Sequence, residues 1–357
     1  MERGGAAQGP RILWIDAVRG VTISLVVLLH AAVILVVWFP AVESGPLEPL
    51  MQSIQFLRLV RMPAFFFCSG LVFSFAIARG WSWFLRRRLR FALWVVTVWT
   101  GISLAVEGAG LHLYPQSATP FVPAGQLLWV PYGNLWFIYA MLLVSALALL
   151  LRPLPLPVQH LAVLVLGLAA MSVDLEAGLP PGLQLLAGGL TQDALVFFML
   201  GVWWGPALVR LLNNPRAALA AQFILPAIGL IILDRFAPTG IWLPVLVMLP
   251  MTVGFLAAIR TLSGWEPGAR LFAAIGRRSL EVFLLHQFFL AAVFALLQRF
   301  APGIGPVAAL PVLWLVPLAG SVLAARILRA LTGSILFDAP AWLAWHFGRA
   351  RTEMAAG

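Results

Sequence analysis

Residues 14–38 read WIDAVRGVTISLVVLLHAAVILVVW, a run of apolar side chains interrupted by Asp16, Arg19 and His30. Its length and composition are typical of a helix that crosses a bilayer, which needs about 20 mainly apolar residues. Ionisable groups inside such a helix are costly, so they usually face the protein interior or a water-filled cavity and mark function. The stretch therefore predicts a transmembrane helix that presents polar side chains to a cavity.

Comparable apolar runs recur from end to end of the chain, which has 357 residues, 62% of them hydrophobic and 10% charged. That composition lies far from that of soluble domains, and the runs lack the alternation of a membrane barrel. We expect an all-α polytopic membrane protein that forms one transmembrane domain over residues 1–357, with a core at about 11–331. Ten spans are expected, at residues 17–38, 51–77, 88–106, 133–151, 158–173, 190–211, 216–234, 241–260, 279–298 and 306–330.

The basic residues predict the orientation. All 23 of them are arginine, and the formal net charge is +10. With the N-terminus in the cytoplasm, every arginine lies on the inner side except Arg58, Arg61, Arg235 and Arg299. This bias is the positive-inside signal, so the charge indicates topology rather than nucleic-acid binding, and an even number of spans places both termini inside.

Metal chemistry is not expected. Cys68 is the single cysteine, which excludes an intrachain disulfide and a cysteine-based metal site. No two histidines have the spacing of metal ligands.

Arg19 and His30 are expected to share one face of the first span. Eleven residues at 100° per residue leave them about 20° apart around the helix and about 16 Å apart along it. Histidine is the side chain best suited to accept a proton near neutral pH. A lone histidine in an apolar run is more often structural, but the arginine aligned below it favours a functional role. Asp16, three residues before Arg19, is the expected ion-pair partner.

The second and third spans carry further candidates. Arg61 opens the segment RMPAFFFCSG at 61–70, in which Pro63 can kink the helix and Ser69-Gly70 can allow close packing. Arg61 either faces the cavity or extends to the outer interface. In the run Arg86-Arg87-Arg88-Leu89-Arg90, the first two arginines fit the topology signal. Arg88 and Arg90 lie deeper and could bind phosphates.

Near the start of the ninth span lies Glu281, which is four residues after Arg277 and can pair with it. His286 lies about 140° from Glu281 around the helix, so the two do not form a dyad on one face. His286 could equally pack in the interior or line the cavity.

Taken together, these elements resemble the acyltransferase-3 family of bacterial integral membrane O-acyltransferases. The matching motifs are Asp-x-x-Arg-Gly with a later His (Asp16, Arg19, Gly20, His30), Arg-x-Pro-x-Phe-Phe-x-x-Ser-Gly (Arg61 to Gly70), Arg-x-Arg (Arg88, Arg90), Leu-Trp-Phe (135–137) and Gly-x-x-Ser-Leu ending in Leu-His (Gly276 to His286). The chain departs from the family after Arg90, where Phe91-Ala92-Leu93 replaces a frequent proline.

The resemblance implies an enzyme of the bacterial cytoplasmic membrane. It would transfer an acyl group, commonly acetyl from acetyl-CoA, to a hydroxyl of a cell-envelope glycan or lipid-linked sugar. The resemblance, with the spacing above, assigns catalysis to His30, Arg19 and Asp16. Donor or substrate binding would then involve Arg61, Arg88, Arg90, Ser69, Trp136, Glu281 and His286.

Rival functions stay open at this point. Within enzymes, the acceptor could be an amine, or the acyl group could pass through a covalent acyl-histidine. Outside enzymes, a transporter or flippase of sugars or lipids would need no acyl-CoA and should tolerate the loss of a base.

Overall fold

The computed structural model describes residues 12–39, 48–110, 113, 135–172, 194–236 and 243–343. Within these ranges the chain forms helices and no strand. Eight segments are long and apolar enough to cross a bilayer: Leu13–Trp38, Glu48–Ser74, Ile77–Gly108, Leu195–Leu212, Pro215–Arg235, Val245–Leu262, Ser279–Phe300 and Pro306–Thr332. Two shorter apolar helices cover Trp136–Leu151 and Leu156–Gly167. These segments correspond in order to the expected spans, and the prediction of an all-α polytopic membrane protein is confirmed.

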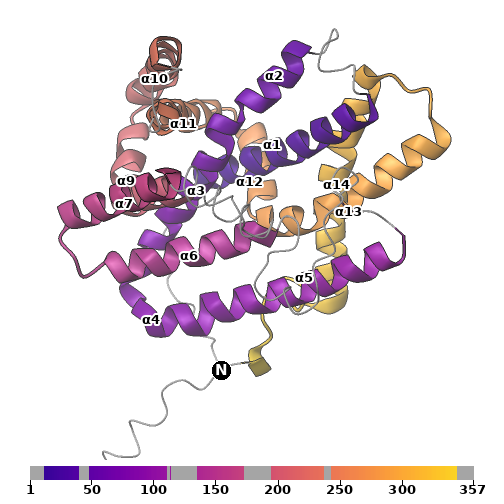
Figure 1. The fold of residues 1–357 in the computed structure, drawn as a ribbon, viewed down its shortest axis with the longest axis horizontal. Coiled ribbons are helices and arrows are strands. Elements are labelled where there is room, and N and C mark those ends of the chain that lie inside the picture. Colours follow the sequence, from indigo (N-terminus) through magenta and orange to yellow (C-terminus); the bar gives the residue numbers. More distant parts are fainter. Residues whose placement is uncertain are drawn as a thin grey trace, which may run out of the picture.

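Figure 1 shows the arrangement of these elements. The main helices are α1 (Leu13–Trp38), α2 (Glu48–Phe56), α3 (Arg58–Ser74), α5 (Arg90–Gly108), α6 (Trp136–Leu151), α7 (Leu156–Ser172), α9 (Leu195–Leu212), α10 (Pro215–Phe236), α11 (Leu243–Leu262), α13 (Ser279–Phe300) and α14 (Pro306–Thr332). Shorter elements are α4 (Gly80–Trp83), a π-helix (Phe84–Leu89) and α12 (Glu266–Gly276).

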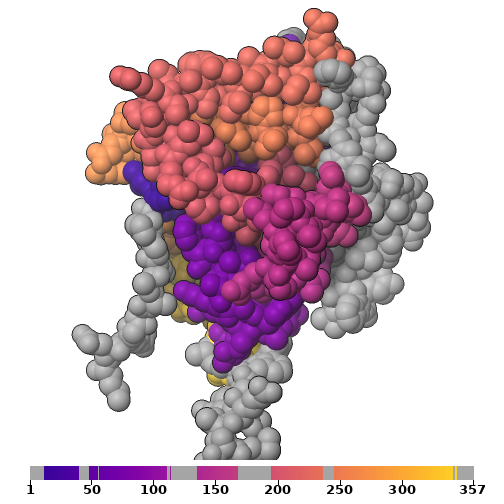
Figure 2. All heavy atoms as spheres, turned by 90° about the vertical axis from the view of Figure 1, so that its left-hand side faces the viewer, coloured from indigo at the N-terminus to yellow at the C-terminus, as the bar shows by residue number. Residues whose placement is uncertain are grey.

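Helices α1 and α3 run through the middle of the molecule (Figure 1). The most extensive helix pairs are α1 with α12, α3 with α9, α10 with α11, and α13 with α14. In the side view of Figure 2, residues of α9 to α11 form one end of the visible face, and the violet residues before α6 form the other. The central position of α1 and α3 places their polar residues where several other helices can reach them.

Glycines allow α3 and α9 to approach closely. A Cβ added at Gly70 of α3 would collide with the carbonyl of Phe198, and one at Gly201 of α9 with the carbonyl of Phe67. Small residues at membrane helix interfaces permit this backbone contact. The close packing predicted for the Ser69-Gly70 step is therefore present, with α9 as the partner helix.

Two elements were not expected from the sequence. The amphipathic helix α12 lies between the expected eighth and ninth spans, where the sequence predicts only a loop. Its 11 residues are too few to span a bilayer, so it gives no span signal. The third span begins near Ile77 rather than at residue 88 and contains the π-helix Phe84–Leu89. In a π-helix each N–H bonds five residues back, so the arginines in it follow a different rotation from that of an α-helix.

Candidate active site

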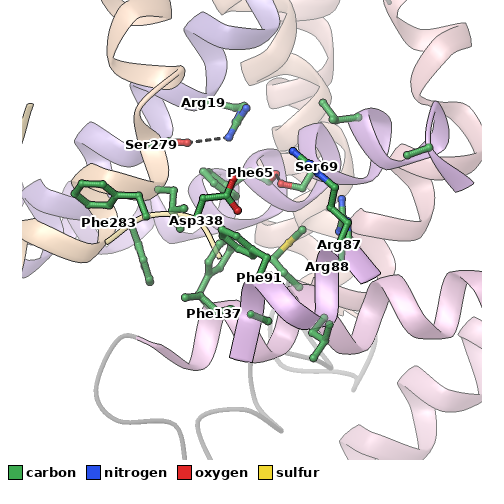
Figure 3. A pocket seen from close by; sticks show the side chains of 18 of the residues that line it. Arg19, Phe65, Ser69, Arg87, Arg88, Phe91, Phe137, Ser279, Phe283 and Asp338 are labelled. Atoms are coloured by element: carbon green, nitrogen blue, oxygen red, sulfur yellow. Dashed lines mark hydrogen bonds between the residues drawn. The ribbon is translucent and has the colours of Figure 1, made fainter. Parts of the chain in front are cut away.

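A cavity of about 480 Å³ lies among α1, α3, α5, α6, α13 and α14 (Figure 3). Pockets of this size accommodate small organic ligands or parts of larger ones. The lining includes Arg19 of α1, Phe65 and Ser69 of α3, Arg87 and Arg88 of the π-helix, Phe91 of α5, Phe137 of α6, Ser279 and Phe283 of α13, Arg329 of α14, and Phe337 and Asp338 beyond α14.

The charged side chains of this lining are mainly cationic. Arg19, Arg87, Arg88 and Arg329 line the cavity together with one carboxylate, Asp338. Figure 3 shows Arg87 and Arg88 on the side of the cavity away from Phe283. Guanidinium groups form strong charge-assisted hydrogen bonds with phosphates and carboxylates, so the cavity suits an anionic ligand.

Arg19 does not form the ion pair that was expected. Its guanidinium donates a hydrogen bond of 2.9 Å to the hydroxyl of Ser279 and lies 6.0 Å from the centre of the Phe65 ring. None of the ion pairs among the described residues joins Arg19 to Asp16. The reason is tertiary: Gly276 packs against the backbone of Asp16 and brings the start of α13 beside Arg19. The prediction that Asp16 holds Arg19 is therefore wrong.

Glu281 also has a different partner from the one expected. Its carboxylate accepts two bonds from Arg329 of α14, from Nε at 2.8 Å and from an Nη atom at 2.6 Å, and it is buried. Arg277 is exposed and lies between α12 and α13, so the helical spacing of four residues does not apply to it. Glu281 therefore has a structural role, because it holds Arg329 at the cavity wall.

The π-helix distributes its arginines unequally. Arg88 donates to the Ser145 hydroxyl at 2.5 Å and lies 4.4 Å from the centre of the Phe73 ring. Arg86 is exposed and bonds to Ser82, four residues before it. Arg90 is half-buried but does not line the cavity, whereas Arg87 does. The expected pair of Arg88 and Arg90 is thus replaced by the adjacent residues Arg87 and Arg88.

A second polar group lies deeper along α1. The rings of His30 and His286 are 5.3 Å apart, and Arg61 of α3 interacts electrostatically with His30. Arg61 and His286 are both buried, so Arg61 does not extend to an interface. The Nδ1 atom of His286 faces the carbonyls of Val282 and Phe283, at 3.1 and 2.8 Å. That ring is therefore oriented by its own helix, with Nδ1 as the donor.

Comparison with known proteins identifies the family. A family model described as an acyltransferase domain matches residues 12–326. The chain belongs to the acyltransferase-3 family. No curated protein and no solved structure matches the chain. The protein is therefore a membrane acyltransferase, and the cavity residues described above lie within the matched residues except for Arg329, Phe337 and Asp338.

In this acyltransferase, aromatic rings separate the cavity from the histidine pair. The Phe283 ring is 5.1 Å from Phe137 and 6.0 Å from His286, and Phe137 is 5.0 Å from Phe65. All three phenylalanines line the cavity. A ligand that extends from the arginines toward His30 must therefore pass these rings.

Of the two remaining candidates, Ser69 lines the cavity and Trp136 does not. Ser69 lines the cavity and donates its hydroxyl to the carbonyl of Phe65 at 2.9 Å. Trp136 is half-buried and packs edge-on against Phe137. Of the Leu-Trp-Phe segment at 135–137, Phe137 is the residue that lines the cavity.

Proposed function

We propose that this protein transfers an acyl group, most simply acetyl, from cytoplasmic acyl-CoA to a hydroxyl of a cell-envelope glycan or lipid-linked sugar in the bacterial cytoplasmic membrane. The observation that carries the proposal is the convergence of Arg19, Arg87, Arg88 and Arg329 on one cavity in a membrane acyltransferase. These arginines come from α1, the π-helix and α14, which are far apart in the sequence.

Acyl-CoA fits the charge of this cavity. The donor carries several phosphate charges, which need compensating cations wherever water is excluded. Arginine forks bind phosphate oxygens with two parallel hydrogen bonds, and Arg87 and Arg88 are adjacent at the cavity wall. The positive-inside bias assigns this end of the molecule to the cytoplasm, where the donor is available.

The deep histidine supplies the base. His30 lies eleven residues beyond Arg19, about 16 Å along the axis of α1, so the extended arm of the donor spans the interval and its phosphates stay at the arginines. In the reaction, the acceptor oxygen attacks the thioester carbonyl carbon, a C–O bond forms and the C–S bond breaks. His30 takes the hydroxyl proton and returns it to the departing sulfur. General-base catalysis of this kind contributes about 10²–10⁴-fold to the rate.

The acceptor approaches from the other side of the membrane. His30 lies about 13 Å past the inner end of the first span, near the centre of a bilayer about 30 Å thick. A base at that depth can be reached from the outside by a hydroxyl, while the thioester comes from the inside. Envelope glycans and lipid-linked sugars offer such hydroxyls at the outer face.

The experiment compares cells that carry the gene with cells that lack it and with cells that express the His30→Ala variant. Mass analysis of purified envelope glycans and lipid-linked sugars should show acyl increments only with the intact gene. Purified protein should release free CoA from acetyl-CoA when the acceptor is added. A transporter would change the amount or location of a glycan but would consume no acetyl-CoA. Unchanged glycan masses together with no acceptor-dependent CoA release would contradict the proposal.

A further inference from the structure

The chain beyond α14 folds back onto the cavity. It turns at Gly333, whose φ of 64° is a value that favours glycine. The N–H groups of Phe337 and Asp338 then donate to the carbonyl of Ser334 at 2.9 and 2.7 Å. We call residues 334–339 the strap. The strap lies after residue 326, where the family match ends, so the family assignment does not account for it.

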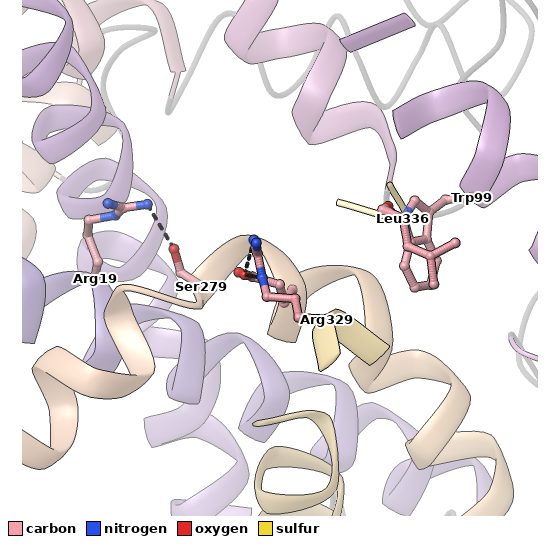
Figure 4. Close-up of polar contacts among 6 residues, drawn as sticks. Arg19, Trp99, Ser279, Arg329 and Leu336 are labelled. Carbon is pink, nitrogen blue, oxygen red and sulfur yellow. Dashed lines mark hydrogen bonds and ion pairs between the residues drawn. The ribbon is translucent and has the colours of Figure 1, made fainter. Parts of the chain in front are cut away.

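The strap is anchored to α5 and α14. The indoles of Trp94 and Trp99 donate hydrogen bonds to the carbonyls of Ile335 and Leu336 at 2.6 and 2.7 Å. Figure 4 shows Trp99 beside Leu336, and Arg329 on the side toward Ser279. Phe337 is 1% exposed, and its ring centre lies 5.4 Å from the Arg329 guanidinium. These contacts make the strap a fixed wall of the cavity.

This wall places a negative charge among cations. Asp338 lines the cavity, and Figure 3 shows its carboxylate turned toward the middle of that space. The carboxylate accepts the N–H of Ala339 at 2.9 Å, and no ion pair among the described residues includes it. Arg329 is already paired with Glu281. The Asp338 charge therefore acts on whatever anion enters the cavity rather than on one arginine.

We infer that Asp338 sets the anion affinity of the cavity, because its carboxylate repels the phosphates of the donor and of the product CoA and so promotes product release. The naming of CoA rests on the proposed function. Like charges in a partly buried site repel at short range, and this repulsion weakens with salt. Product CoA keeps every phosphate of the donor, so a cavity that contained only cations would release it slowly.

The test is the affinity of the purified full-length protein and its Asp338→Asn variant for CoA and for inorganic pyrophosphate, measured by calorimetric titration. Asparagine keeps the shape and an oxygen to accept the Ala339 N–H. We expect the variant to bind both anions more tightly, on the order of three- to tenfold, with a smaller difference at high salt. Steady-state turnover should fall as KM falls, because product release slows.

Two further variants test the position of the charge and the anchoring of the strap. Asp234→Asn removes the same charge from an exposed residue of α10, side chain 83% exposed, and should leave both affinities unchanged. Trp99→Phe removes the hydrogen bond to Leu336 but retains an aromatic ring, and should reproduce part of the Asp338→Asn effect.

The outcomes separate this inference from the donor assignment. Equal affinities in wild type and Asp338→Asn would overturn it, and weaker binding in the variant would show instead that Asp338 binds the donor. If wild type binds pyrophosphate but not CoA, the donor assignment fails, and the pyrophosphate comparison still decides the inference. If neither protein binds CoA or pyrophosphate, the inference fails as well, because it requires an anion-binding cavity.

Discussion

At the scale of single residues, the histidine pair has unequal members. His286 is fully buried with Nδ1 held by two carbonyls of its own helix, whereas His30 is partly exposed and lies beside it. A proton acceptor must reach the substrate, and a ring held by the backbone suits a supporting position. The geometry therefore favours His30 as the base and His286 as the residue that positions it.

His30→Ala should lower the rate of acyl transfer by about 10²–10⁴-fold, while membrane insertion and the unfolding temperature stay close to those of wild type. The measurement is acceptor-dependent CoA release by purified protein. His160→Ala is the matched control, because His160 packs against Trp203 and Trp204 and does not line the cavity. Near-normal turnover in His30→Ala would remove the base assignment.

Arg88→Ala should weaken acetyl-CoA binding by roughly tenfold to a hundredfold, which is the range for the loss of one charge-assisted contact. Arg88→Lys should restore only part of the affinity, because an ammonium lacks the planar fork. Calorimetric titration of acetyl-CoA measures both. Arg86→Ala is the control from the same π-helix, since Arg86 is exposed and bonds to Ser82. If Arg86→Ala and Arg88→Ala lose the same affinity, the effect is one of general charge rather than of the cavity.

At the scale of elements, the position of Arg19 depends on how closely α12 approaches α1. A Cβ at Gly20 would collide with the Phe272 carbonyl, and one at Gly276 with the Asp16 carbonyl. The two helices therefore touch through their backbones directly beside Arg19. The α12–α13 junction follows this contact and brings Ser279 within reach of Arg19.

Gly20→Ala should destabilise the protein by about 1–3 kcal/mol, the usual range for overpacking a close interface. It should also weaken donor binding, because Arg19 and Ser279 move apart. Thermal unfolding in detergent, followed by tryptophan fluorescence, measures the first effect. Gly101→Ala is the control: Gly101 is on α5 with open space around it, and alanine favours a helix over glycine by about 1 kcal/mol. An unchanged unfolding temperature in Gly20→Ala would show that the interface can relax.

The spans and several cavity residues can be predicted from the sequence, because apolar length and charge are visible in it. Apolar length reports directly on membrane helices, and charge in or beside a span reports on function, which points to Arg19 and Arg88. Ser69 follows from the family motif instead. The pairs Arg19–Ser279 and Glu281–Arg329 join residues 260 and 48 positions apart, so local spacing could not predict them. The sequence favours Arg88 and Arg90 over Arg87 because they lie deeper in the expected span, and it gives no sign of the π-helix in which Arg87 lines the cavity. Asp338 carried no signal, since it follows the last span.

At the scale of the whole molecule, the two polar groups lie at different depths of one bundle. The cavity lined by Arg19, Arg87, Arg88 and Arg329, here called the arginine cavity, lies at the start of α1, the start of α13 and the end of α14. The histidines lie further along α1 and α13. Helices α1 and α13 therefore run in the same direction, and α14 runs in the opposite direction. With the N-terminus in the cytoplasm, as the arginine bias predicts, this end of the bundle would be the cytoplasmic one.

Cysteine labelling tests that orientation, because Cys68 is the single native cysteine and is buried. In the ten-span arrangement, the turn between α13 and α14 is outside and the start of α12 is inside. Gly303→Cys, in an exposed turn with open space, should react in intact cells with a maleimide that cannot cross the membrane. Glu266→Cys removes only an exposed ion pair with Arg270, which contributes little to stability, and should react only after the membrane is opened. The reverse pattern would place the arginine cavity outside, away from cytoplasmic acyl-CoA, and labelling of both positions in intact cells would contradict the ten-span arrangement itself.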